Sequence, residues 1–251
     1  MTETARTSAG TCSFCYLDRA RHARPNRYRL FGELLWHADA MHFVLTINQR
    51  DSREVGDQVP ELLRSLRHIP AAVGFQRSVG DELQGILADP AAAVDAALIA
   101  VRARRWHVGL GIGEIRRPLP QDVLQAEGFG LVYARRAVER AQRTGDRIPL
   151  AVEGPDTQIA AEAEAVLRLL GQLVASRTTA EWNVLDLLTP GARGQQKYVA
   201  EVLGISAQAV SKAVVRAHWV EEWATRPAAA RLLDLAAGPA SLPPAPLPYL
   251  R

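Results

Sequence analysis

The feature that most constrains this fold is a change of pattern at Gly154-Pro155. Before it, short apolar runs alternate with stretches of helical periodicity, and after it only helical periodicity remains. The predicted strands cover residues 43–47, 72–79, 83–87, 106–115 and 148–152, with helices between them at 55–68, 91–105 and 131–143. The first six elements follow the order of a split βαβ, or ferredoxin-like, unit. The sequence therefore predicts an α+β chain in which an all-α part follows the sheet.

The same pattern divides the chain into four parts. Residues 1–40 show neither period, and we expect a flexible N-terminal arm or an over-called start site there. Residues 41–153 are predicted to form a ferredoxin-like domain for sensing or dimerisation, and residues 157–235 an all-α domain. Residues 236–251 are rich in proline and are expected to be an extended or disordered tail.

Composition excludes several classes of protein. The chain has Lys+Arg 30 against Asp+Glu 27, and a net charge of +3 is too small to indicate nucleic-acid binding by itself. No run approaches about 18 apolar residues, and the first residues lack the apolar centre of a secretory signal, so neither a membrane span nor export is expected. The only cysteines, Cys12 and Cys15, exclude a disulfide framework, and a cytoplasmic location is expected. With His22 they supply half of a zinc site, and two unpaired thiols are the simpler interpretation.

The segment from Gln196 to Arg216 has the spacing of a helix-turn-helix. Ala200 lies four residues before Gly204, and Val210 lies six residues after it. A small residue lets two helices cross closely, glycine permits a turn with positive φ, and an apolar residue fills the space between the helices. Ser206 is placed to cap the second helix. The remaining core of this pair is expected from Val199, Val202, Leu203, Ile205 and Val214.

Two flanking segments complete the predicted all-α domain. Trp182, Leu185 and Leu188 have helical spacing and predict a supporting helix over residues 180–188. Residues 218–221 begin either the wing of a winged helix-turn-helix or a further helix.

The outer face of the second predicted helix carries residue types that contact base edges. Glutamine at 208 suits adenine and lysine at 212 suits guanine, and the only two lysines of the chain lie in this segment. We expect double-stranded DNA as a partner, and a homodimer on a two-fold operator because one such unit contacts few bases. A helical hairpin that binds only protein is the alternative. The predicted DNA-binding residues are Arg193, Lys197, Ser206, Ala207, Gln208, Ser211, Lys212 and Arg216.

Polar residues also gather where the predicted strands end. Residues 48–53 follow the first strand, and residues 79–85 lie at the hairpin between the second and third strands, which turns tightly at Gly80-Asp81. Acids at such a hairpin can hold Mg²⁺ for nucleotide phosphates, and the glycines of the next strand would let a ligand approach the backbone. The alternative is that Asp81 and Glu82 cap the hairpin and pair with Arg53 or Arg77.

These motifs make the chain resemble the SatD family of bacterial proteins over residues 41–217. The matching motifs are Ser52-Arg53, Gly80-Asp-Glu-Leu-Gln-Gly85, Gly109-Leu-Gly-Ile-Gly113 and Ala134-Arg135. The resemblance implies a regulatory role, and the C-terminal segment resembles the helix-turn-helix of MarR-like regulators. The α/β part is also distantly similar to class III nucleotidyl cyclases, which place metal-binding aspartates on the first strand and at such a hairpin.

The chain departs from the cyclase pattern at positions that matter for catalysis. Asn48 stands where a carboxylate is expected, and Tyr133 occupies roughly the place of an asparagine that serves the transition state. We therefore expect this domain to bind a ligand such as a nucleotide without turning it over. The predicted ligand-binding residues are Asn48, Ser52, Arg53, Asp81, Glu82, Gln84, Gly111, Gly113 and Arg135, with Asp81 as the candidate ligand of a Mg²⁺ ion.

The sequence thus predicts a bacterial transcriptional regulator with a non-catalytic, nucleotide-binding, cyclase-like domain. Its expected partners are double-stranded DNA, a second copy of the chain and a nucleotide effector, without a membrane. The alternative is a Mg²⁺-dependent nucleotide-binding or nucleotidyl-cyclase-like enzyme whose helical part is an interaction module.

Overall fold

The computed structural model describes residues 41–145 and 147–238. The predicted arm with Cys12, Cys15 and His22 lies outside the described residues, as does the predicted tail from residue 239 onward. The first three residues assigned to that tail are described, and two of them belong to the last helix, which runs to Ala237.

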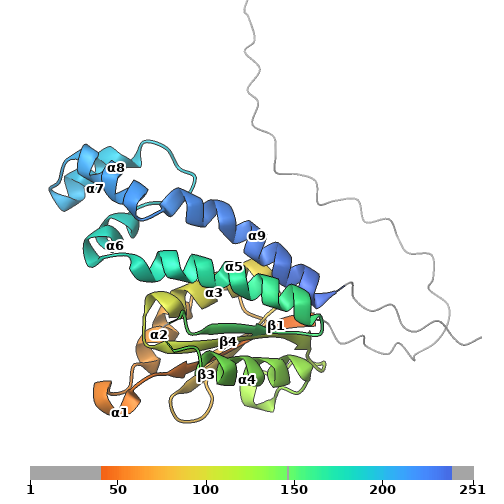
Figure 1. Cartoon of the computed structure of the whole chain (residues 1–251). Coiled ribbons are helices and arrows are strands. Elements are labelled where there is room, and N and C mark those ends of the chain that lie inside the picture. The colour runs from red at the N-terminus through yellow and green to blue at the C-terminus, as the bar shows by residue number, and fades with distance from the viewer. Residues whose placement is uncertain (1–40, 146, 239–251) are drawn as a thin grey trace, which may run out of the picture. The chain divides into compact units, whose positions relative to one another are not determined.

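Five strands form one mixed sheet, in the order β2-β3-β1-β4-β5 (Figure 1). The strands are β1 (Met41–Gln49), β2 (Val73–Arg77), β3 (Glu82–Leu87), β4 (Trp106–Glu114) and β5 (Leu150–Glu153). The first four pair antiparallel with their neighbours, and β5 pairs parallel to β4. A mixed sheet with abundant helix is compatible with the predicted α+β class.

The helices alternate with the strands up to β5 and then follow one another. They are α1 (Ser52–Val55), α2 (Val59–Leu66), α3 (Pro90–Arg102), the 3-10 turn η1 (Val123–Gln125), α4 (Phe129–Ala141), α5 (Thr157–Ser176), α6 (Thr179–Leu185), α7 (Gln195–Leu203), α8 (Ala207–Arg216) and α9 (Trp219–Ala237). The helix predicted over residues 55–68 is observed as α2, which begins only at Val59, because Val55 ends the short helix α1 and Gly56 follows it with a φ of 77°.

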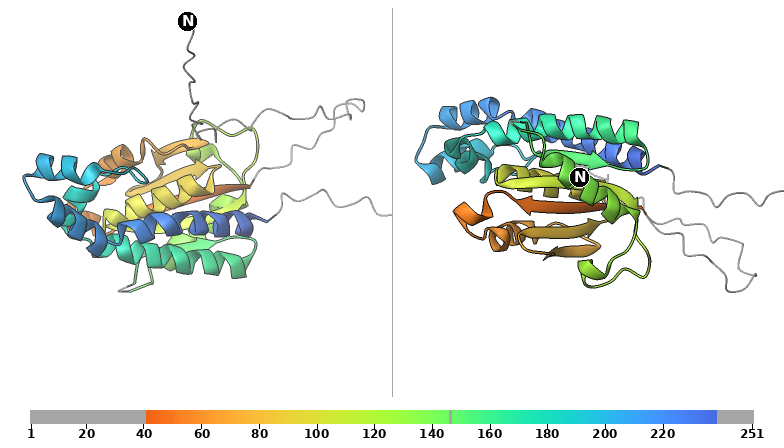
Figure 2. Two further views of the ribbon diagram at one scale, coloured as in Figure 1. Left: turned by 90° about the horizontal axis from the view of Figure 1, so that it is seen from above. Right: turned by 60° about the horizontal axis from the view of Figure 1, so that its bottom comes forward.

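Helices α3, α9 and α5 cover one face of the sheet, with α9 between the other two (Figure 2). Alternate residues of β1, among them Phe43, Leu45 and Ile47, point to this face and are buried. Leu233 of α9 and Leu167 of α5 lie in the same hydrophobic core. The C-terminal helices therefore share the main core with the sheet, although the sequence pattern changes at Gly154.

Helices α6, α7 and α8 have a small core of their own. It contains Val184, Val199 and Val210, which are all nearly inaccessible to solvent. Glu222 of α9 pairs with both Arg177 and Arg226, and Arg226 also pairs with Asp95 of α3. The pair of Glu222 with Arg177 is fully buried, and the end of this ionic chain at Asp95 is partly exposed. Helix α8 contacts both α6 and α9, and the Arg177 guanidinium donates to the carbonyl of Ala217 at the end of α8.

Within the described part of the chain, no single helix is long and apolar enough to cross a membrane. The segments Gln195–Leu203 and Ala207–Ala237 meet the criteria of length and composition only when taken together, and the chain bends by 106° between them.

Candidate nucleic-acid interface

Helices α7 and α8 are joined by a short turn with the predicted geometry. Gly204 ends α7 with a φ of 65°, where a side chain would be strained, and the Ile205 amide donates to the carbonyl of Ala200 at 3.0 Å. Ser206 then begins α8, since its hydroxyl accepts a hydrogen bond from the Ala209 amide at 3.1 Å. The local sequence therefore specifies both the end of the first helix and the start of the second.

The residues predicted at the centre of the core between α7 and α8 are buried, but two that were predicted at its edge are exposed. Ala200 and Val210 are 7% and 0% exposed and lie in one core, supported by Val184 of α6. Val202 and Ile205 were expected in that core, but they are 52% and 40% exposed. They differ because the last turn of α7 and the turn itself project beyond the area that α6 and α8 cover.

The predicted DNA-binding residues lie on α8, on α7 and in the loop before it, and nearly all are exposed. Gln208 and Lys212 point outward from α8, and Ser211 between them is partly buried. Within the described residues, neither Lys197 nor Lys212 forms an ion pair. Arg216 lies 3.5 Å from Glu181, and its side chain is still 70% exposed, so this pair is weak.

The helix pair carries an excess of basic residues. Between Thr189 and His218 there are four basic residues, Arg193, Lys197, Lys212 and Arg216, and one acidic residue, Glu201. This stretch therefore has a net charge of +3. A local basic surface is the electrostatic requirement for contact with phosphates.

A predicted wing is replaced by a helix. Residues 218–221 were expected to begin a wing or a further helix, and α9 begins at Trp219, directly after α8. His218 makes the corner with a φ of 49°. No strand occurs in the described residues 154–238, so the second expectation is correct and the winged form is not.

Four of the nine predicted ligand-binding residues come together on the face of the sheet that α4 covers. Glu82 is 8% exposed and pairs with Arg135 of α4 at 3.1 Å. Asn48 lies opposite Glu82 in the β1–β3 register, and Gln84, two residues along β3, donates to the Thr46 hydroxyl at 3.0 Å. The partner of Glu82 is therefore an arginine of α4, where the sequence suggested Arg53 or Arg77.

The remaining candidates do not join this cluster. Ser52 and Arg53 lie on α1, and Asp81 lies in the β2–β3 turn, where its backbone carbonyl accepts from the Gln49 amide. Across residues 41–145 and 147–238, no three His, Cys, Asp or Glu side chains are placed to hold a metal ion. With Glu82 engaged by Arg135 and Asn48 neutral, Asp81 lacks companions for a Mg²⁺ site.

The glycines of β4 admit a helix and not a ligand. A Cβ atom at Gly109, Gly111 or Gly113 would come closer than 3.0 Å to backbone atoms of α4. These glycines alternate along the strand, and all three face α4. The ligand predicted at Gly111 and Gly113 is therefore contradicted, because the α4 backbone fills that space.

His107 lies opposite Asn48 in the β1–β4 register, next to the cluster of Asn48, Glu82, Gln84 and Arg135. Burial, and then Arg50, lower the pKa of His107 below its ordinary value of 6.5, and Asp51 opposes them in part. The unfolded chain therefore binds this proton more readily, so the contribution of His107 to stability falls as the pH drops below 6.5. A His107→Gln variant should lose less stability over that range in urea denaturation. Parallel pH profiles for the two proteins would contradict this.

Comparisons with protein-family models, with curated proteins and with solved structures give no match to this chain. The resemblance to the SatD family and to nucleotidyl cyclases therefore remains a prediction from the motifs.

Proposed function

We propose that this chain is a bacterial DNA-binding transcriptional regulator in which α7 and α8 form a helix-turn-helix. The observation that carries the proposal is the outward face of α8, where Gln208 and Lys212 are exposed. They lie on a helix that Ser206 caps and that a buried core supports. A helix presented in this way fits the major groove, where glutamine can bind adenine and lysine can bind guanine.

Three other basic side chains also support DNA binding by α7 and α8. Lys197 lies on α7, Arg193 in the loop before it, and Arg216 at the end of α8, and all three are exposed. Contacts of this kind orient a protein on phosphates and carry no sequence information. We therefore propose that Lys197, Arg193 and Arg216 contact the phosphates of the DNA, and that Gln208 and Lys212 contact the base edges.

We further propose that β1 to β4, with α1 to α3, are a ferredoxin-like unit, extended by α4 and β5. The strand order β2-β3-β1-β4 and the antiparallel pairing support this assignment. In the proposal this unit senses a signal or brings two copies together, so that a homodimer binds a two-fold operator in the cytoplasm. The cyclase-like enzyme is less well supported, because Glu82 is held by Arg135.

Selection from a pool of random DNA duplexes tests the proposal with the full chain. We expect enrichment of a sequence with two-fold symmetry, bound at least about 10³-fold more tightly than unrelated duplexes. No enrichment over the starting pool would contradict sequence reading by α8.

The dependence on salt separates phosphate contacts from base contacts. Lys197→Ala should weaken binding to all duplexes alike and reduce the slope of log K against log salt by about 1, since one counterion fewer is released. Binding measured between about 50 and 200 mM salt gives this slope. The matched control is Arg143→Ala, which removes an exposed arginine just after α4, outside the helix pair α7–α8. An unchanged slope in Lys197→Ala would exclude Lys197 from the interface.

A further inference from the structure

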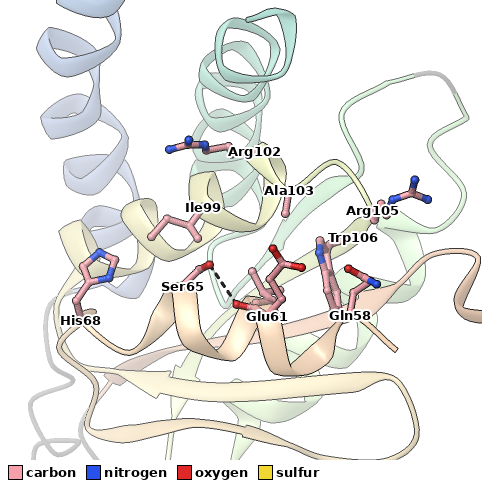
Figure 3. A pocket seen from close by; sticks show the side chains of 10 residues that line it. Gln58, Glu61, Ser65, His68, Ile99, Arg102, Ala103, Arg105 and Trp106 are labelled. Atoms are coloured by element: carbon pink, nitrogen blue, oxygen red, sulfur yellow. Dashed lines mark hydrogen bonds between the residues drawn. The ribbon is translucent and has the colours of Figure 1, made fainter. Parts of the chain in front are cut away.

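A polar pocket that the sequence did not indicate lies between α2 and the end of α3 (Figure 3). Its volume is about 520 Å³, which is ample for a small metabolite. Leu62, Ile99 and Trp106 supply apolar lining, and Glu61, Arg102 and Arg105 bring charge to it.

The charged groups around the pocket come from different elements. Glu61 rises from α2 toward the end of α3, Arg102 ends α3, and Arg105 precedes β4 (Figure 3). Within the described residues, the side chains of Glu61 and Arg105 form no ion pair. An anionic group, Glu61, and a cationic group, Arg105, are thus available at one cavity without an ion pair of their own in the described part of the chain.

Arg102 already has a carboxylate partner. Its guanidinium donates two hydrogen bonds, each 2.7 Å long, to Asp186 at the end of α6. It also lies over the ring of Trp182 at 3.8 Å. The pair is half exposed, with side-chain exposures of 40% and 48%, so it contributes at most about 1 kcal/mol and a ligand can compete for it.

We infer that this pocket binds a small zwitterion. Its ammonium or N–H group would donate to the Glu61 carboxylate, and its carboxylate or phosphate would accept from Arg102, with Arg105 adding positive potential. The apolar lining favours a short aliphatic body between the two ends. Neither a simple anion nor a simple cation satisfies both sides of the pocket.

Binding at this pocket has a consequence for α6. A ligand that engages Arg102 draws it from Asp186 and weakens the contact between α3 and α6, the helix that supports α7 and α8. The ligand would then change DNA binding, and this regulatory step rests on the proposed function. Zwitterion binding itself does not depend on DNA.

Isothermal titration calorimetry on the full chain, without DNA, tests the inference. The probes are the free L-amino acids, for a carboxylate, and O-phosphoethanolamine, for a phosphate, with sodium acetate and ammonium chloride as single-charge controls. We expect at least one zwitterion to bind, and Glu61→Gln and Arg102→Gln each to raise its Kd by about tenfold or more.

Asp186→Asn should act in the opposite direction. It removes the competitor for Arg102, so the Kd should fall by about two- to fivefold. The matched control Glu127→Gln, which removes an exposed carboxylate paired with Arg116, should leave the Kd unchanged. The inference is overturned if no zwitterion binds, if acetate binds as tightly as the zwitterions, or if the Glu61 and Arg102 variants bind like the wild type.

Discussion

Replacement of Gly111 by alanine is expected to destabilise the protein by about 3 kcal/mol or more. The new Cβ would overlap the backbone nitrogen of Ala134 in α4, and backbone cannot move aside as a flexible side chain can. Relief requires α4 to move away from β4, which would open the packing around Ala134 and Val138. Equilibrium urea denaturation followed by circular dichroism measures the loss.

Gly74 in β2 is the matched control, because a Cβ there meets nothing within 4 Å. Gly74→Ala should change the free energy of unfolding by less than about 1 kcal/mol, with either sign. If Gly111→Ala is as stable as Gly74→Ala, α4 does not lie against β4 as described.

Replacement of Glu222 by glutamine is expected to cost about 3–5 kcal/mol. Glu222 is 0% exposed and lies 2.5 Å from Arg177, which is also buried. Without the carboxylate, the guanidinium of Arg177 keeps two hydrogen bonds to the Ala217 carbonyl but loses its counter-charge in a site that water does not reach. A buried charge without a partner destabilises far more than the pair stabilises.

Two further variants check this origin of the loss. The double variant Arg177→Met with Glu222→Met should be destabilised by less than the sum of the single changes, because it leaves no uncompensated charge between them. Asp186→Asn breaks the exposed pair with Arg102 and should cost at most about 1 kcal/mol. A loss of similar size for Glu222→Gln and Asp186→Asn would contradict the buried pair.

Local patterns in the sequence predict the elements and the α7–α8 turn well. Ala200, Gly204 and Val210 lie within one short segment, and their spacing predicts the turn. In the structure Gly204 ends α7, and Ala200 and Val210 are buried against each other's helices. The exposure of Val202 and Ile205 is not predictable in this way, because it depends on how far α6 and α8 extend over them.

Contacts between segments that are far apart in the chain could not be predicted from the sequence. The glycines of β4 indicate that something approaches the strand closely, but glycine does not specify whether this is a ligand or a helix. The pair of Arg177 with Glu222, and the pocket beside Arg102, depend on where α5, α9 and α2 meet in space. Their residues show no spacing that would connect them.

The most direct test of the central claim is DNA binding by a Gln208→Ala/Lys212→Ala variant. The full chain is titrated onto the selected duplex and onto an unrelated one, and affinity is followed by fluorescence anisotropy. Each base contact contributes about 1–3 kcal/mol, so the account predicts a loss of at least about 30-fold on the selected duplex and a much smaller loss on the unrelated one. Gln172→Ala/Arg143→Ala, at exposed positions outside α7 and α8, should bind like the wild type. Equal affinity of the Gln208/Lys212 variant and the wild type for the selected duplex would contradict base reading by α8.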